Sequence, residues 1–113
     1  MTEIQVIQTG NQATIILGEK LVASDVPELK NELKGLIAAG VRSLSFDCSR
    51  LTQMDSTGIG CLVATHNSLT KVDGNLSMLQ VSSDIHDLLC SMRLDRRIKI
   101  TTRFAGQIET TQE

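Results

Sequence analysis

The residues best suited to chemistry are Asp55 and Ser56, a carboxylate beside a primary hydroxyl, followed closely by Gly58 and Gly60. An apolar run that ends at Cys48 precedes them and a helical pattern follows, so we expect a strand-to-helix junction. The first N–H groups of a helix lack intrahelical partners, and the helix dipole adds partial positive charge there. Such a position tolerates an anion, including a phosphate on serine. We therefore predict that Ser56 is a regulatory phosphoacceptor rather than a catalytic nucleophile.

The spacing of residues around Ser56 argues against several kinds of catalytic loop. A nucleophile elbow needs glycine two residues before the serine, where Met54 stands. No Gly-Lys-Ser/Thr phosphate-binding loop occurs, and the third glycine of a dinucleotide fingerprint would fall at Val63. An aspartic-protease triplet needs glycine where Thr57 stands. His66 is better explained as a histidine at the edge of the core than as a base for Ser56. We predict no catalytic residues and no enzymatic activity.

The composition is that of one compact domain. The chain has 113 residues, 41% of them hydrophobic, with a net charge of −2. It fits a single domain over residues 1–113, in which the polar tail 107–113 is expected to fray. One local basic run, within residues 93–99, is expected to flank a helix end rather than form a nucleic-acid-binding stripe. No apolar stretch approaches the roughly 20 residues that cross a bilayer. Neither nucleic acid nor a membrane is therefore an expected partner.

The three cysteines, Cys48, Cys61 and Cys90, form no C-x-x-C pair. An odd number without this spacing predicts neither a disulfide framework nor a zinc knuckle. Free cysteines fit a reducing compartment, and the N-terminus lacks the basic start and apolar middle of a signal peptide. We therefore predict a cytoplasmic protein that binds no metal and no cofactor.

Hydrophobic periodicity predicts an alternation of strands and helices. The fold class is α/β, a mixed sheet of about five strands with helices packed mainly on one face. The first two strands form a hairpin around Gly10 and Asn11, and the later strands run parallel through right-handed crossovers. The Asp55–Gly58 junction then lies at the carboxyl edge of the sheet, where such folds usually place functional loops. Strands are expected over residues 3–8, 13–17, 43–48, 75–80 and 98–102, and helices from 25 to 40, 57 to 72 and after 82–84.

Capping residues are predicted at the helix starts. Asp25 and Glu28 have the spacing of a capping box, and Pro27 falls in the first turn, where its missing N–H costs nothing. Ser56 is a candidate N-cap of the second helix, a role that serine fills very often. A plain cap that is never phosphorylated is therefore the structural alternative for Ser56.

The stretch Leu51–Gly60, which follows Phe46-Asp-Cys-Ser, resembles the signature of the STAS domain family. More narrowly, it is similar to the single-domain bacterial anti-sigma-factor antagonists, and the resemblance extends over nearly the whole chain. It implies a partner switch in which a protein kinase phosphorylates Ser56 and a metal-dependent phosphatase restores the serine. The unphosphorylated form would bind an anti-sigma factor that is itself the kinase, and phosphorylation would release it. A monomer is expected for so small a switch.

The resemblance also implies a partner-binding surface. Family members often carry an acidic residue before the first helix, where this chain has Val22 and, three residues later, Asp25. We further expect the bare Gly58 and Gly60 to let the partner's backbone approach closely. The implied surface consists of Asp55, Ser56, Thr57, Gly58 and Ile59, together with Asp25.

Three other functions remain open at this point. A constitutive STAS subunit of a bacterial transporter ATPase complex would use the fold without phosphorylation. Such subunits tend to show threonine after the aspartate, so Ser56 favours the switch. A small-molecule sensor would need a lined pocket, and no aromatic or basic lining is evident in the sequence. A hydrolase that uses Ser56 would need a base, which the sequence does not place nearby.

Overall fold

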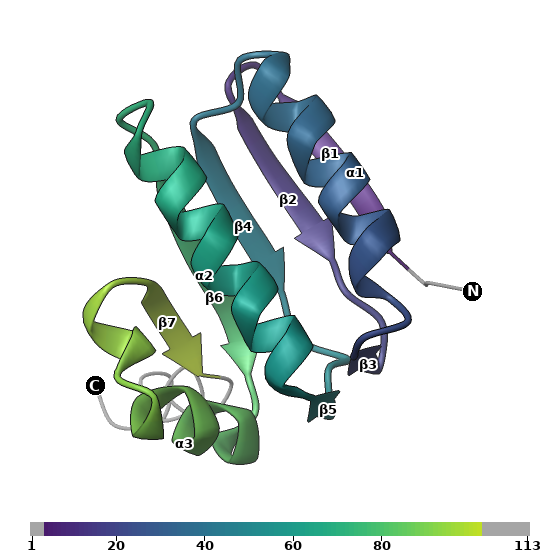
Figure 1. Cartoon of the computed structure of the whole chain (residues 1–113), viewed down its shortest axis with the longest axis vertical. Helices are drawn as coiled ribbons and strands as arrows, with labels where there is room; N and C mark the ends of the chain where they lie inside the picture. Colours follow the sequence, from purple (N-terminus) through teal and green to yellow (C-terminus); the bar gives the residue numbers. More distant parts are fainter. Residues whose placement is uncertain (1–3, 103–113) are drawn as a thin grey trace, which may run out of the picture.

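A five-stranded mixed sheet forms the centre of the computed structural model, which describes residues 4–102. The strand order is β1-β2-β4-β6-β7 (Figure 1). The first pair is antiparallel and every other neighbouring pair is parallel, which confirms the predicted mixed α/β sheet. The predicted tail lies outside the described residues. The strands are β1 (Gln5–Thr9), β2 (Gln12–Ile16), β4 (Ser43–Asp47), β6 (Asn75–Val81) and β7 (Lys99–Thr102).

The hairpin between β1 and β2 closes through a two-residue turn, as predicted. Thr9 pairs with Gln12, and Gly10 adopts a φ of +60°, a conformation that two-residue hairpin turns require and that glycine adopts without strain. The Asn11 carbonyl oxygen then accepts hydrogen bonds from the backbone N–H groups of Arg42 (2.8 Å) and Ser43 (3.1 Å). The turn is thereby attached to the start of β4.

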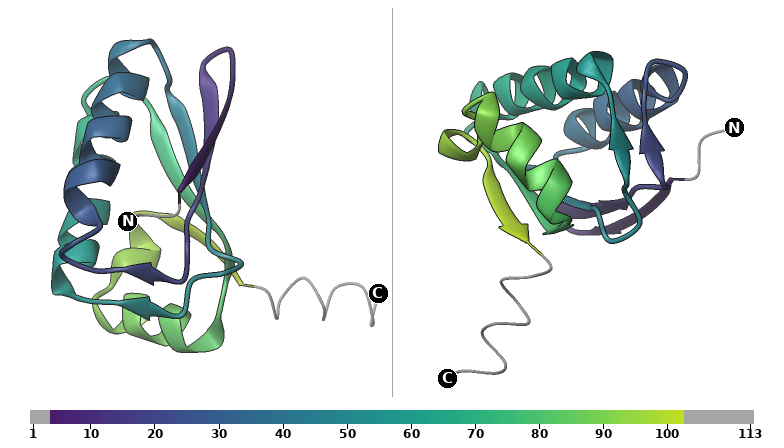
Figure 2. Two further views of the ribbon diagram at one scale, coloured as in Figure 1. Left: turned by 90° about the vertical axis from the view of Figure 1, so that its right-hand side faces the viewer. Right: turned by 90° about the horizontal axis from the view of Figure 1, so that it is seen from below.

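Two long helices cover one face of the sheet (Figures 1 and 2). Along β4, Leu44 and Phe46 are fully buried toward these helices, whereas Ser43, Ser45 and Asp47 on the other face are half-buried. This alternation follows the two-residue period of a strand with one covered face. The third helix is shorter and packs against β7. The helices are α1 (Val26–Ala38), α2 (Ser56–Thr70) and α3 (Ser83–Ser91), and a short 3₁₀ helix, η1, spans Leu94–Arg96.

A second, very small sheet was not predicted. β3 (Lys20–Leu21) pairs in parallel with β5 (Gln53–Met54). The Glu19 carbonyl oxygen extends this pairing by accepting hydrogen bonds from the Thr52 and Gln53 N–H groups at 2.8 and 3.1 Å. Strands of two residues are too short to produce a hydrophobic period, which explains why the sequence predicted only a connection here.

The predicted capping box at Asp25 is wrong. Asp25 does precede α1, but its backbone is helical (φ −91°, ψ −22°) and its side chain makes no capping hydrogen bond. Its carboxylate instead accepts a hydrogen bond from the Val22 N–H at 3.2 Å, within a turn in which the Asp25 N–H donates to the Val22 carbonyl oxygen at 2.8 Å. This side-chain hydrogen bond thus lies in the turn before α1, and the first turn of α1 receives no side-chain cap from Asp25. Pro27 lies in the first turn of α1 as predicted.

None of the helices within residues 4–102 combines the length and the apolarity that a bilayer-spanning helix needs.

Candidate functional site

The predicted site lies where β5 passes into α2. In Figure 1 the arrowheads of β2, β4 and β6 point toward the end of the molecule that carries β3, β5 and the start of α2. The junction therefore occupies the carboxyl edge of the sheet, where the sequence placed it. Asp55 is the one residue between the end of β5 at Met54 and the first helical residue, Ser56.

The Asp55 carboxylate connects two segments that are distant in sequence. One oxygen, Oδ1, accepts a hydrogen bond from the Gly58 N–H in the first turn of α2 at 3.0 Å. The other, Oδ2, accepts from the Ala23 N–H, 32 residues earlier, at 3.1 Å. The Asp55 N–H in turn approaches the Leu21 carbonyl oxygen at 3.4 Å. A single side chain thus attaches the segment between β3 and α1 to the start of α2.

These hydrogen bonds also fix the charge of the site. The Gly58 N–H is the main cause that lowers the pKa of Asp55 below its ordinary value, and the Ala23 and Thr57 N–H groups add to it. Partial desolvation acts in the opposite direction and is outweighed. Hydrogen bonds donated to a carboxylate favour its ionised form. Asp55 is therefore negatively charged at neutral pH, next to the positive end of the helix dipole.

Ser56 is not the N-cap, and that prediction is wrong. Asp55 occupies the N-cap position with an extended backbone (φ −105°, ψ −177°), and Ser56 is the first helical residue. The Ser56 side chain is exposed. Within the part of the chain that the structure describes, no hydrogen bond engages its hydroxyl. Because the carboxylate of Asp55 performs the capping, the hydroxyl of Ser56 faces solvent without a structural task.

The other predicted surface residues differ in exposure. Thr57 is exposed beside Ser56, Asp25 and Asp55 are half-buried, and Ile59 is 7% exposed and packs in the core. The structure therefore brings Asp25, Asp55, Ser56 and Thr57 to the surface at this edge and directs Ile59 inward.

Gly58 has a different role from the one expected. It is buried, and a Cβ atom on it would collide with the Leu21 carbonyl oxygen of β3. The backbone that approaches Gly58 is thus this chain's own. Gly60 is exposed, and a Cβ atom there would have no neighbour within 4 Å. Of the two glycines, only Gly60 is open to another molecule.

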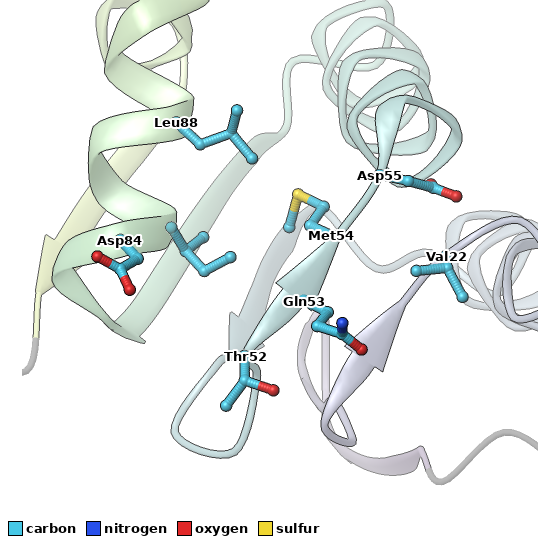
Figure 3. Close-up of a pocket in the computed structure, with 8 residues that line it drawn as sticks. Val22, Thr52, Gln53, Met54, Asp55, Asp84 and Leu88 are labelled. Carbon is cyan, nitrogen blue, oxygen red and sulfur yellow. The ribbon is translucent and has the colours of Figure 1, made fainter.

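A groove that the sequence did not reveal lies beside Asp55, between the small sheet and α3 (Figure 3). Its volume is about 360 Å³. In Figure 3 the Met54 side chain points from β5 toward α3. The Ser82 hydroxyl caps α3, beside this groove, by accepting a hydrogen bond from the Ile85 N–H at 3.3 Å. The groove has a mainly apolar lining with two carboxylates and is formed by Val22, Thr52, Gln53, Met54, Asp55, Asp84, Ile85 and Leu88.

Neither histidine of the chain lies beside Ser56. His66 lies ten residues further along α2, about 15 Å at the rise of an α-helix, and is half-buried at the core edge. His86 contacts Cys90 instead, with Nε2 at 3.5 Å from Sγ. Over the same residues, no three His, Cys, Asp or Glu side chains are grouped as a metal site requires.

Comparison with known proteins relates this geometry to a family. The model of the STAS domain matches residues 3–106. An anti-sigma-B factor antagonist from Staphylococcus epidermidis is 35% identical over 69 residues. These residues are 61% of this chain and 64% of that relative, so the match spans less than two thirds of the relative's length.

Solved structures agree with the fold. An anti-sigma factor antagonist from Mycobacterium paratuberculosis superposes with a TM-score of 0.79 over 100% of this chain and 96% of its own, at 15% identity. The Bacillus cell fate determinant SpoIIAA, in its phosphorylated form, superposes with a TM-score of 0.72 over 95% and 98% of the two chains, at 19% identity. Likeness at these identities shows a common fold.

Asp55→Ala is expected to destabilise the protein at neutral pH, because it removes both hydrogen bonds of the carboxylate. The folded-state pKa lies below the unfolded value, so the stabilisation is complete above the ordinary value of 3.8 and is lost as the pH falls through the folded-state pKa. Urea unfolding midpoints of the wild type and Asp55→Ala should therefore differ at pH 7 and converge as the pH falls below 3.8. Glu32→Ala, on the exposed face of α1, is the control. A difference that stays constant down to acid pH would contradict the assignment.

Gly58→Ala and Gly60→Ala form a matched pair within one helical turn. A Cβ atom at Gly58 would collide with the Leu21 carbonyl oxygen and approach Met54 Cγ at 3.2 Å, so we expect a loss of about 1–3 kcal/mol in the free energy of unfolding. Gly60→Ala has open space and should be neutral or add up to about 1 kcal/mol of helix stability. Urea unfolding distinguishes them, and equal effects would argue against the close approach of β3 to α2.

Proposed function

This chain belongs to the STAS domain family, and within it we propose that the protein is an anti-sigma-factor antagonist controlled by phosphorylation of Ser56. The unphosphorylated form binds an anti-sigma factor that is also the kinase of Ser56. Phosphorylation releases the partner, and a serine phosphatase restores binding. In this proposal the protein is a cytoplasmic, monomeric regulator without catalytic activity of its own. The name of the S. epidermidis relative supports the class of partner.

The observation that carries this proposal is the division of roles between Asp55 and Ser56. Asp55 caps α2 through Gly58, so the exposed hydroxyl of Ser56 is not needed for the fold. A phosphate on Ser56 would lie at the start of α2, where unpaired N–H groups and the helix dipole favour negative charge. The domain can therefore accept the phosphate with its fold intact, and the modification changes the surface alone.

Release of the partner then follows from electrostatics. Phosphate adds about −1.5 to −2 charges next to the ionised Asp55. In a kinase active site the new phosphate would also face the catalytic carboxylate and the phosphates of the bound ADP. An unpaired charge in such an interface costs about 3 kcal/mol or more, which corresponds to a loss of more than about a hundredfold in affinity.

The surface proposed for the partner combines exposed and half-buried residues around this edge. Ser56, Thr57 and Gly60 provide the exposed part on α2, and the turn that contains Asp25 lies against it through the hydrogen bond between Asp55 and Ala23. The groove between the small sheet and α3 borders Asp55 and provides apolar contact area. Gly58 and Ile59 are buried, so in this proposal they support the surface from below and do not contact the partner.

Phosphorylation is tested first on protein purified from its native cells. Intact mass and peptide mapping should find one phosphate on Ser56. The variant Thr57→Ala, which removes the neighbouring exposed hydroxyl, should keep the phosphate, and Ser56→Ala should lose it. A phosphate that stays in Ser56→Ala and disappears in Thr57→Ala would contradict the assignment. Absence of phosphate under all growth conditions, with phosphatase inhibitors present, would favour a constitutive subunit of a transporter ATPase complex.

Binding is tested with Ser56→Ala and Ser56→Asp as baits. We expect Ser56→Ala to retain a protein kinase, identified by mass spectrometry, and Ser56→Asp to bind it at least about tenfold more weakly, since a single carboxylate carries less charge than phosphate. Both variants should unfold at the urea midpoint of the wild type, because Asp55 still caps α2. Equal binding by the two variants would contradict a switch at this residue.

A further inference from the structure

A second cavity, of about 370 Å³, lies at the opposite end of the sheet from Ser56. The strands β6 and β7 begin at this end, whereas β3, β5 and the start of α2 lie at the other (Figure 1). α2 contributes to both ends, since it begins at Ser56 and carries His66 into the cavity. The cavity is formed by His66, Gly74, Asn75, Leu76, Ser77, Arg97 and Lys99.

The polar side chains of this lining are basic or can donate hydrogen bonds. His66, Arg97 and Lys99 are basic types, and no carboxylate lines the cavity. Arg97 and Lys99 are exposed, and neither forms an ion pair or a side-chain hydrogen bond with another residue in the range 4–102. The Asn75 Oδ1 atom accepts a hydrogen bond from the Ser43 hydroxyl at 3.3 Å, which leaves the amide NH₂ as the donor.

The fold explains why Arg97 and Lys99 converge. They flank Ile98, which is 1% exposed and is anchored by a hydrogen bond from its N–H to the Leu94 carbonyl oxygen at 2.9 Å. Arg97 ends η1 in a turn and Lys99 begins β7, so the two exposed side chains reach the cavity from either side of the buried Ile98.

The staggered starts of β6 and β7 provide the other wall of the cavity. The first paired residues are Ser77 and Lys99, so Asn75 and Leu76 of β6 extend beyond the start of β7. On its other side this end of β6 pairs with β4, and the cavity lies where β7 has not yet begun, next to Arg97.

The basic run follows the end of α3, as predicted, but the expectation from the sequence that no basic lining exists is wrong. Arg97 and Lys99 line the cavity, whereas Arg93 and Arg96 of the same run do not. His66 comes from a different element, and its 31-residue separation from Arg97 hides the cluster in the sequence.

We propose that this cavity binds a small phosphate-bearing molecule. A guanidinium group matches a phosphate with two parallel hydrogen bonds, and charge-assisted hydrogen bonds of this kind are short and strong. The volume is near the lower end of the range of about 300–1,000 Å³ for ligand pockets, which suits a phosphate or a small phosphate ester. No Phe, Tyr or Trp lines the cavity to stack a base. The site is independent of the switch proposed at Ser56.

The test uses the ¹⁵N-labelled protein and three probes at constant ionic strength: inorganic phosphate, pyrophosphate and citrate. Backbone amide signals of residues 74–77 and 97–99 should shift saturably, with pyrophosphate at least tenfold tighter than citrate. Arg97→Gln and Lys99→Gln should each weaken pyrophosphate binding at least about tenfold. Arg96→Gln is the matched control from the same basic run and should bind as the wild type does. The two test variants replace exposed side chains, and their urea midpoints verify that they fold.

Four results would overturn the proposal. They are shifts that grow linearly without saturation, an equal loss in Arg96→Gln, citrate binding as tight as that of pyrophosphate, and shifts confined to residues 55–58. The last result would indicate an anion at the start of α2 instead. The first three outcomes do not depend on whether Ser56 is phosphorylated.

Discussion

The two hydrogen bonds of the Asp55 carboxylate are the interaction on which this edge of the domain depends. They join the first turn of α2 to the segment that precedes α1, and they close the small sheet of β3 and β5 against the helix. Surface connections without such anchors tend to be mobile. The same carboxylate satisfies an N–H group that the helix start leaves unpaired. Asp55 therefore stabilises this junction, and the hydroxyl of its neighbour Ser56 is exposed and makes no contact that the fold needs.

The larger elements were predictable because their signals are repeated. Four apolar residues recur at helical spacing along α1 and two alternate along β4, and the structure buries all six: Val26, Leu29, Leu33, Leu36, Leu44 and Phe46. The pairing of β3 with β5 was not predictable, since two residues provide no period. The groove beside Asp55 was also not predictable from the sequence, because its walls come from three segments that lie about thirty residues apart in the chain.

The cap of α2 was misassigned for a reason that the sequence does not contain. Aspartate and serine are both favoured N-cap residues, and they stand side by side. The backbone decides between them, since the extended conformation falls on Asp55 and the helix begins at Ser56. Gly58 was misjudged likewise, because nothing near it in sequence indicates that Leu21 packs against it. The local sequence predicted a strand-to-helix junction at this position. It did not predict the structural roles of Asp55 and Gly58, because these depend on contacts with β3 and the segment that follows it.

The two ends of the sheet differ in charge, although the net charge of the chain is only −2. Asp55 and Asp84 line the groove at the carboxyl edge, and Arg97 and Lys99 line the cavity at the amino edge. Clefts lined by one sign of charge concentrate the opposite sign near the surface. A modest overall charge thus conceals two regions that attract different kinds of molecule.

The burial of Gly58 bears on how such domains diverge. Asp55 and Gly58 are required by contacts inside the chain, whereas the intervening Ser56 and Thr57 face solvent. Selection for the fold alone would retain the first pair and let the second drift. Under the switch proposed at Ser56, a descendant that abandoned regulation could therefore keep a signature with aspartate and glycine in place and lose only its serine. In such a relative, the aspartate and the glycine would indicate common ancestry, and the residue after the aspartate would indicate whether the proposed phosphorylation site is kept.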